Sequence, residues 1–358
     1  MIRLLVDSFA DDGLLNAQMS NAREIIRRLD PQRFHVSMFR LGVPDPLIAQ
    51  RPNTAFIQLP KRRQTVRIIY EFLWGKHDIL FYLKSSPASR YYLGLRKKWR
   101  DDRIVIGTME SQADMRMEPT IRPEAVRLWE RTVPRCDYIF SNSRSVQRSL
   151  RQEYGLGSGV IPTGVDTKFF TPSHREPNVR PRVLFAGALR PFKGPQLVLD
   201  AARMFPYADF ALAGDGMMRA ELQSRVERDG LNNVGFLGLL QPVRLREEYR
   251  KADIFLFPSK WEGSPKVILE AAACGLPVIA RQNYEPETVI DGCTGYLADS
   301  DAGIFERLEH LLHDPQHCHS LGAAARKHSE GFDWDVISRQ WEETFMELAS
   351  KRGDRFAA

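Results

Sequence analysis

The chain has 358 residues, of which 43% are hydrophobic and 27% are charged, so it is long enough for two globular domains with buried cores. No stretch approaches the roughly 18 uncharged apolar residues of a membrane-spanning helix, and the N-terminal MIRLLVDSF predicts a strand and not a signal peptide. The four cysteines stand singly in unlike contexts, which argues against a disulfide framework or a zinc site and indicates a reducing cytoplasm.

The charge is unevenly distributed along the chain. Residues 1–165 hold 27 Lys and Arg against 17 Asp and Glu, a net charge of +10, and the remainder holds 24 against 28, a net charge of −4. We therefore expect the first half to meet an anionic partner, which could be lipid headgroups, a phosphorylated acceptor or nucleic acid. No nucleic-acid-binding motif accompanies the charge, so an anionic membrane surface is the favoured partner.

In the first half, short apolar runs alternate with helical patterns, which predicts a parallel sheet covered by helices. Strands are expected at Ile2–Val6, Phe34–Phe39, Ala55–Leu59, Asp78–Leu83, Ile104–Thr108 and Cys136–Ser143. The loop Asp7–Asn16 has one glycine, Gly13, where a dinucleotide-binding loop would have three. Asp11, Asp12 and Gly13 are candidates for orienting an acceptor hydroxyl, although solvated loop charges are the commoner explanation. Glu110 is a further polar acceptor candidate at a strand end.

The segment Lys61–Trp74 combines basic residues with apolar residues at helical spacing. The apolar positions are Val66, Ile69, Tyr70, Leu73 and Trp74. One interpretation is a basic amphipathic helix that lies on a membrane. The other, which is more common, is a helix that covers one face of the sheet. A second basic cluster at Arg96–Arg103 favours a basic surface in this region.

The second half begins after a polar, proline-containing segment, Ser173–Pro181, which predicts an interdomain linker. Arg182–Ala188 then predicts a new strand, and the turn GALRPFKG that it enters holds Gly187, Arg190 and Lys193. A lysine that follows a glycine-bearing strand end favours a phosphate contact, and the alternative is an ordinary exposed loop lysine.

Residues 253–280 predict a strand, a loop, a helix and a second strand. Ser264 suits the N-cap of the helix and Pro265 its first position. The helix would open at the carboxyl end of the strand Asp253–Phe257, where free backbone N–H groups and the helix dipole favour phosphate. The candidate phosphate-facing residues are Gly263, Ser264, Lys266 and Val267.

Two glutamates flank this predicted phosphate site, Glu262 in the loop and Glu270 in the second turn of the helix. A helix rises about 1.5 Å per residue, so the two carboxylates could reach opposite ends of one ligand. A nucleotide diphosphate sugar has the matching layout, with its sugar and ribose on either side of the diphosphate. The alternative is that Glu262 caps the helix and Glu270 is a solvated surface charge.

Four segments, in order, resemble glycosyltransferase family 4, retaining enzymes with two Rossmann-like domains (the GT-B type). They are the exit from the first domain, IPTGVD; the turn GALRPFKG; the Glu262-x7-Glu270 pair followed by AAACGLPVI; and a last strand region around DGCTGYL. The resemblance implies that Glu262 contacts the transferred sugar, Glu270 the ribose, and Lys193 the diphosphate. It also implies that the strand holding Leu237 borders the nucleotide base and that no bound metal is needed.

The chain departs from the family pattern at several places, one of which is Asp11-Asp12-Gly13-Leu14, where similar transferases often carry a Gly-Gly pair. Ser264-Pro265 stands where Phe-Gly is usual, and Ala188 stands at an arginine position that Arg190 could replace. No histidine follows the strand before Glu110, where related enzymes commonly place one near the donor sugar. The last departure puts the sugar identity in doubt more than the reaction class.

We therefore predict an α/β protein of GT-B type, with two Rossmann-like doubly wound domains facing a cleft. The expected acceptor domain spans residues 1–172, the linker 173–181 and the donor domain 182–335. A C-terminal helix at 336–358 is expected to cross back to the first domain.

The predicted activity is retaining transfer of a sugar from a UDP- or GDP-linked donor to a glycan or lipid-linked acceptor, in cell-surface polysaccharide or glycolipid synthesis. Glu262, Lys193 and Arg190 are the predicted catalytic residues. We predict no cofactor, no nucleic acid partner, and a cytoplasmic protein, either free or peripheral on the inner face of the membrane. A sugar-nucleotide epimerase and a non-catalytic nucleotide-sugar-binding protein are the alternatives.

Overall fold

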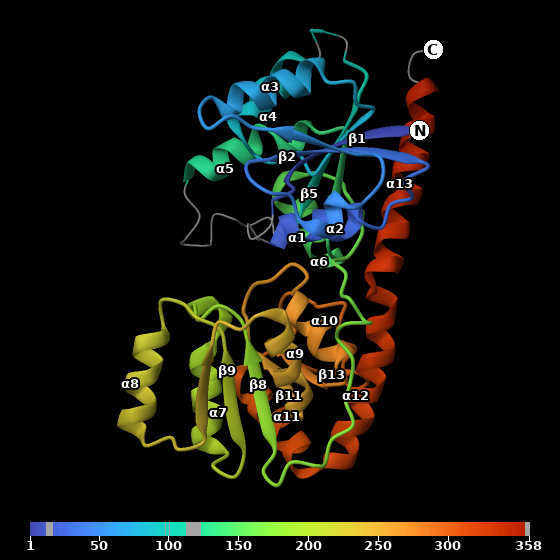
Figure 1. Cartoon of the computed structure of the whole chain (residues 1–358). Coiled ribbons are helices and arrows are strands. Elements are labelled where there is room, and N and C mark those ends of the chain that lie inside the picture. Colours follow the sequence, from blue (N-terminus) through green and yellow to red (C-terminus); the bar gives the residue numbers. More distant parts are fainter. Residues whose placement is uncertain (12–16, 97, 100, 112–122, 355–358) are drawn as a thin grey trace. The chain divides into compact units, whose positions relative to one another are not determined.

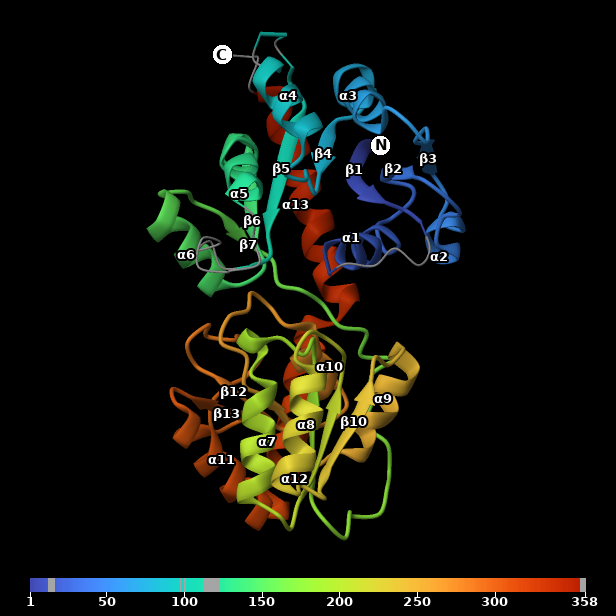
Figure 2. The same cartoon turned by 90° about the vertical axis from the view of Figure 1, so that its left-hand side faces the viewer.

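The computed structural model describes residues 1–11, 17–96, 98–99, 101–111 and 123–354, and the chain divides into two compact units. The first unit comprises Met1–Pro162 together with Trp334–Ala358, and the second comprises Thr163–Asp333. Figures 1 and 2 show the two units from two sides. The first division falls earlier than the predicted boundary at residue 172, and the predicted linker, 173–181, groups with the second unit.

Local contacts explain why the chain just after Pro162 belongs to the second unit. The backbone N–H of Val165 donates to the carbonyl of Phe332 at 2.9 Å, and that of Thr167 donates to the Asp333 carboxylate at 3.1 Å. Phe170 is buried in the core of the second unit. These residues are thus held by the second core before the polar segment begins.

The first unit is built on a parallel sheet whose described strands follow the order β3-β2-β1-β4-β5-β6-β7. The strands are β1 Ile2–Phe9, β2 Phe34–Arg40, β3 Thr54–Gln58, β4 Ile79–Phe81, β5 Ile104–Met109, β6 Tyr138–Ser141 and β7 Gly159–Val160. The helices are α1 Ala17–Ile26, α2 Pro46–Ala49, α3 Gln64–Trp74, α4 Pro87–Leu95, α5 Pro123–Glu130, α6 Arg144–Tyr154 and α13 Trp334–Asp354, with a 3₁₀ turn η1 at Val133–Arg135.

Side chains alternate between the two faces of this sheet, as the period of a strand requires. Leu4 and Val6 pack in a core with α1 and α13, whereas Leu5 between them packs in a core with α3 and α4. In neighbouring strands Ile79 pairs with Leu4 and Leu80 with Leu5, so the alternation carries across the register. Both faces are therefore apolar, which explains the unbroken hydrophobic runs in the sequence.

The C-terminal helix α13 belongs to the first unit, which confirms the predicted return. Its Trp341 and Phe345 rings lie 4.7 and 4.8 Å from the ring of Phe81, and Phe345 lies 6.1 Å from Phe34. This aromatic cluster packs in the core that the sheet shares with α1 and α13, and Figure 2 shows where these two helices lie in the fold.

The second unit has a parallel sheet whose described strands follow the order β10-β9-β8-β11-β12-β13. These strands are β8 Arg182–Ala186, β9 Asp209–Ala213, β10 Val234–Gly238, β11 Ile254–Phe257, β12 Val278–Arg281 and β13 Gly295–Ala298. The helices are α7 Pro195–Met204, α8 Arg219–Asp229, α9 Pro242–Lys251, α10 Lys266–Ala273, α11 Asp301–His313 and α12 Pro315–Ser329, with 3₁₀ turns η2 at Pro191–Lys193 and η3 at Glu330–Phe332. The strand order reverses between β8 and β11, and such sheets bind ligands at the carboxyl ends of the strands beside the reversal.

The two Rossmann-like units confirm the predicted α/β architecture. Within the described ranges, no helix has both the length and the apolar surface needed to cross a bilayer.

Candidate active site

The turn after β8 and the end of β11 lie close together at the point where the strand order reverses. Gly194 ends the η2 turn with φ of +72°, a left-handed conformation that favours glycine. A Cβ atom on Gly194 would meet the carbonyl oxygen of Pro258 at 2.9 Å, so the turn can approach the strand end only because this residue is glycine. The N–H of Lys260 also donates to the carbonyl of Phe192 at 2.8 Å.

This approach places a cation and a carboxylate together. The ammonium group of Lys193 forms an ion pair with Oε1 of Glu262, and the hydroxyl of Ser259 donates to the same oxygen at 2.6 Å. The Lys193 and Glu262 side chains remain 19% and 12% exposed, so both stay accessible to a ligand. The Lys193 ammonium group also lies 5.4 Å from the ring centroid of Phe257, on β11.

Tyr284 adds a polar group to this region that the sequence reasoning missed. Its side chain is fully buried, and its hydroxyl has no hydrogen-bond partner in the described structure. Burial and the negative charge of Glu262 both raise its pKa well above the usual tyrosine value. Tyr284 follows β12, the strand next to β11, so its position at a carboxyl strand end was the one available signal.

Glu270 lies in α10 and accepts a hydrogen bond from the hydroxyl of Tyr249 at 3.1 Å. Burial raises the pKa of Glu270, and the hydrogen bond from Tyr249 and the charge of Lys266 oppose that shift. Its side chain is half-buried and held, so the alternative of a fully solvated surface charge is wrong.

The start of α10 differs from the predicted one. The helix begins at Lys266 with Pro265 at the cap position and no capping side chain, so Ser264 is not the N-cap. The reason is the backbone of Pro265, whose φ of −71° and ψ of 115° are extended and leave it outside the helix. Gly263 is buried, whereas Ser264, Lys266 and Val267 are half-buried at the helix entrance.

The remaining predicted donor residues lie at the carboxyl edge of the sheet or beside it. Gly187 follows β8, and its N–H donates to the carbonyl of Ala213 at 2.9 Å. Arg190 precedes η2, is exposed, and has no carboxylate partner among the described residues. Leu237 is half-buried in β10, which is separated from β11 by β9 and β8.

In the first unit, Glu110 follows β5 and is held by two polar side chains. Its Oε1 accepts from the hydroxyl of Tyr82 at 2.5 Å and from the amide of Asn21 at 3.0 Å. Tyr82 has φ of +59°, a left-handed conformation that costs a non-glycine residue about 1–3 kcal/mol and is frequent at functional sites. Two further acceptor candidates, Asp12 and Gly13, lie outside the described residues.

Asp11 is buried, and its carboxylate accepts from the N–H of Leu41 at 2.9 Å, so the expectation of a solvated loop charge is wrong for this residue. Its carboxylate fixes the end of β2.

A second acidic group of this unit, Asp7, was placed by sequence in a loop but lies within β1, which continues to Phe9. Burial raises the pKa of Asp7 to about 6, and Lys84 opposes the shift through its charge and its backbone N–H, which donates to Asp7 at 2.8 Å. The neighbouring Ser8 hydroxyl is buried without a partner in the described structure. These groups and Glu110 make the carboxyl end of the first sheet polar.

Helix α3 has features of both interpretations, because one of its sides covers the sheet and the other exposes apolar and aromatic side chains. Ile69 and Leu73 pack toward the sheet, but the side chains of Val66, Tyr70 and Trp74 are exposed by 61%, 53% and 60%. Tyr70 contacts Trp74, and Trp74 contacts the exposed Trp99, with ring centroids 5.2 and 6.0 Å apart. We call Val66, Tyr70, Trp74 and Trp99 the aromatic ridge.

The basic residues near the ridge divide into exposed and paired ones. Lys61, Arg62 and Arg63 are exposed directly before α3. Arg67 pairs with Glu71 at 2.8 Å. Arg96 is buried and pairs with Asp137 at 2.8 Å, so its predicted place on a basic surface is wrong, because this guanidinium supports β5 and β6 from within.

The histidines of the C-terminal region lie on two helices, since α11 ends at His313 and α12 begins at Pro315. His317 contacts the hydroxyl of Tyr296 at 2.9 Å. Among the described residues, no three His, Cys, Asp or Glu side chains converge as a metal site would require.

Comparison with known proteins agrees with this geometry. Residues 166–328 match the family model "Glycosyl transferases group 1". A D-inositol 3-phosphate glycosyltransferase of Paenarthrobacter aurescens is 31% identical over 79% of this chain and 76% of its own length. A GDP-mannose-dependent alpha-(1-6)-phosphatidylinositol monomannoside mannosyltransferase of Mycolicibacterium smegmatis is 28% identical over 84% of this chain and 82% of its own length.

Solved structures share the fold. Sucrose-phosphate synthase from Thermosynechococcus elongatus superposes with a TM-score of 0.80 at 20% identity, over 98% of this chain and 100% of that one. Anabaena HepE in complex with UDP and glucose has a TM-score of 0.75 at 20% identity, over 97% of this chain and 99% of that one.

Proposed function

The chain belongs to the group 1 glycosyltransferases, and from this membership we propose that it transfers a sugar, with retention of anomeric configuration, from a UDP- or GDP-linked donor to a glycan or lipid-linked acceptor. The observation that carries the proposal is the Lys193–Glu262 ion pair at the point where the strand order of the second sheet reverses. A cation for the diphosphate and a carboxylate for the sugar are side by side where such sheets bind ligands.

The donor would lie along the carboxyl edge of the second sheet. Its diphosphate is assigned to Lys193, Arg190 and the N-terminal turn of α10, where the helix dipole favours negative charge. Glu262 is assigned to hydroxyls of the transferred sugar and Glu270 to those of the ribose. The base is assigned to the region of Leu237, with Gly187 allowing the close approach of the backbone.

The chemical step separates the sugar from the diphosphate, and negative charge accumulates on the leaving phosphate. The ammonium group of Lys193 is held near that position before the reaction by Glu262 and the Phe257 ring. A preorganised charge of this kind stabilises the transition state more than the ground state, which is the usual source of the largest catalytic effect.

The acceptor is assigned to the carboxyl end of the first sheet, where Glu110 is held by Tyr82 and Asn21. The net charge of +10 over residues 1–165 supports an anionic acceptor. The names of two relatives point the same way, since D-inositol 3-phosphate and phosphatidylinositol monomannoside both carry phosphate. We place the reaction in the synthesis of cell-surface polysaccharide or glycolipid.

The protein is further proposed to work in the cytoplasm at the inner face of a membrane. The exposed aromatic ridge and the basic residues Lys61, Arg62 and Arg63 lie on and beside α3, which is the composition of an interfacial helix.

A panel of nucleotide sugars tests the donor assignment by thermal shift, because a ligand that binds only the folded protein raises the unfolding midpoint. The best-binding donor is then incubated with and without candidate acceptors, and the products are separated. Transfer requires an acceptor, whereas an epimerase converts the donor alone and a binding protein returns it unchanged. Conversion of the donor to its epimer without an acceptor would overturn the proposed transfer.

A further inference from the structure

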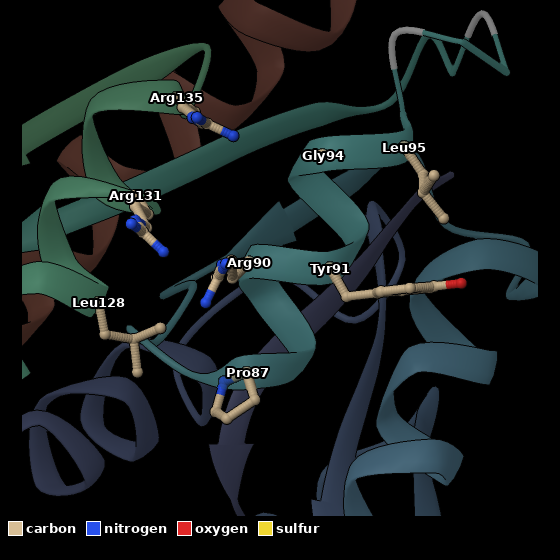
Figure 3. A pocket seen from close by; sticks show the side chains of 8 residues that line it. All are labelled: Pro87, Arg90, Tyr91, Gly94, Leu95, Leu128, Arg131 and Arg135. Carbon is tan, nitrogen blue, oxygen red and sulfur yellow. The ribbon is translucent and has the colours of Figure 1, made fainter. Parts of the chain in front are cut away.

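A hollow of about 800 Å³ lies within the first unit, between α4 and the chain that runs from the end of α5 through η1. This volume is within the range of small-molecule sites. Arg90 projects from α4, and Arg131 and Arg135 project from the facing segment, toward the space between them (Figure 3). The hollow was not predicted from the sequence. Its two walls, α4 and the α5–η1 segment, are far apart along the chain, and β5 lies between them.

The three guanidinium groups differ in one respect from the paired arginines of this unit. None of Arg90, Arg131 and Arg135 has a carboxylate partner among the described residues, and all three are exposed. By contrast, Arg96 pairs with Asp137, and Arg103 pairs with Asp101 at 2.5 Å. Unpaired like charges around one hollow repel each other, and an anion that bonds to several of them relieves the repulsion.

Phosphate is the anion that best fits such a set of donors. A guanidinium group presents a planar fork that bonds two oxygens of one phosphate, and several arginines can share its oxygens. The two acidic residues of α5, Glu124 and Glu130, do not line the hollow, and no carboxylate of the described residues is among its lining.

The rest of the lining is apolar, which selects against a free inorganic anion. Pro87 and Leu128 lie at one end of the hollow, and the backbone of Gly94 lines it on α4, whereas the 53% exposed ring of Tyr91 extends from α4 to the side away from Arg131 and Arg135 (Figure 3). A ligand that fills this site would thus combine a phosphate with an apolar part. Phospholipids have that combination.

The neighbouring helix supplies an independent reason to place a lipid here. α3 packs against α4, and it carries Val66, Tyr70 and Trp74 of the aromatic ridge outward. Tyrosine and tryptophan concentrate at the level of lipid headgroups, where their rings are in an apolar layer and their polar atoms reach water.

We propose that the hollow between α4 and the α5–η1 segment binds the phosphodiester headgroup of an anionic phospholipid. The phosphate bonds to Arg90, Arg131 and Arg135, and the glycerol and first acyl carbons contact Pro87 and Leu128. The inference rests on the proposed work at a membrane but not on the identity of the donor. The proposed site would bind one lipid headgroup per protein molecule, in addition to the non-specific attraction between the basic surface and an anionic membrane.

The test compares two triple variants with the same loss of charge. Arg90→Gln, Arg131→Gln and Arg135→Gln together remove the site. Three other exposed arginines without a carboxylate partner in the described structure, changed to glutamine together, provide the matched control: Arg151, Arg203 and Arg339. Binding to vesicles of phosphatidylcholine with phosphatidylglycerol is measured by sedimentation at several salt concentrations. The thermal shift with UDP and GDP is recorded for every protein, so that a folding defect would be recognised.

The site variant is expected to bind the anionic vesicles about a hundredfold more weakly, since each basic residue at a membrane surface contributes about fivefold. The control variant should retain binding within about twofold at physiological salt, where distant charges are screened. Equal losses in both variants would overturn the site and leave only diffuse attraction.

A soluble probe separates the two sources of phosphate. Glycerol 1-phosphate is titrated into the wild type and into the site variant by calorimetry. Tight, arginine-dependent binding of this probe, with no binding of the vesicles, would overturn the lipid assignment and identify a soluble phosphate ligand. Failure of every nucleotide sugar to bind would overturn the donor proposal and leave the vesicle result unaffected.

Discussion

Lys193 and Glu262, 69 positions apart in the chain, form an ion pair in which Glu262 also accepts a hydrogen bond from Ser259. In the proposed reaction the two side chains contact different parts of the donor. The ammonium group binds the leaving phosphate and the carboxylate binds the sugar. The pair therefore keeps a half-buried carboxylate and a half-buried cation compensated until the donor takes over both contacts.

Lys193→Ala should slow turnover by a factor of about 10²–10³, the cost of removing one charge-stabilising donor from an active site. Affinity for the bare nucleoside of the donor should stay unchanged, because the lysine acts on phosphate. Steady-state kinetics and nucleoside titration measure the two effects. Lys251→Ala is the matched control, since Lys251 forms an exposed pair with Glu248 at 2.7 Å on α9. Equal losses for nucleoside and nucleotide diphosphate would show that Lys193 only shapes the fold.

Glu270→Ala should weaken binding of the nucleotide diphosphate by about tenfold or more, because hydrogen bonds to a charged group contribute about 1.5–3 kcal/mol each. Isothermal titration with UDP and GDP measures the loss. Tyr249→Phe provides the comparison, since it removes the 3.1 Å hydrogen bond to Glu270 and leaves the carboxylate in place. Unchanged affinity in a folded Glu270→Ala protein would reject the ribose contact.

Replacing Lys61, Arg62 and Arg63 together with glutamate should release the protein from anionic vesicles. Each basic residue at the surface contributes about 1 kcal/mol, and the attraction should fall as salt rises and the Debye length shrinks from about 10 Å at 0.1 M to about 3 Å at 1 M. Nucleotide binding should remain, because these residues belong to the first unit. Wild type and variant remaining equally in the supernatant at low salt would contradict the proposed membrane attachment.

Asp7→Asn should change how folding stability depends on pH. The folded-state pKa of Asp7, about 6, is raised by burial above the ordinary value of about 3.9, so the folded protein binds this proton more tightly. Stability from this group is therefore full below about pH 4 and is lost as pH rises through about 6. The unfolding free energy of the variant minus that of the wild type should therefore rise by about 3 kcal/mol as the pH is raised from about 4 to 7.

Denaturant unfolding of both proteins across this range checks the prediction for Asp7. Ser37→Ala is the control, because Ser37 is also buried in the first sheet and carries no titrating group. Parallel pH profiles for Asp7→Asn and the wild type would contradict the raised pKa.

Periodicity and length were sufficient to predict two parallel sheets, because buried parallel strands appear as short continuous apolar runs. The return of the C-terminal helix came from the family resemblance and is confirmed. The boundaries between the two units were harder to predict from the sequence. Nothing in the composition around Phe170 shows that it is buried in the second core, because burial depends on long-range packing.

In the candidate site, too, residues in a local motif could be predicted from the sequence, and residues brought in by long-range packing could not. The turn proposed to bind phosphate and both glutamates were recognisable from local patterns, but Tyr284 and Ser259 join them only through the fold. Arg96 was read as a surface charge because the sequence does not display its partner Asp137, 41 positions away. Arg90, Arg131 and Arg135 were likewise too far apart in the chain to be read as one group.

The position of α13 has a consequence for how the protein is made. The first unit is assembled from two separate stretches of chain, whereas the second unit is one uninterrupted stretch, 163–333. During synthesis, Phe34 and Phe81 emerge long before Trp341 and Phe345, which complete their cluster. The second unit can therefore finish folding while the ribosome still holds α13, and the first unit, although begun earlier, closes its core after the second.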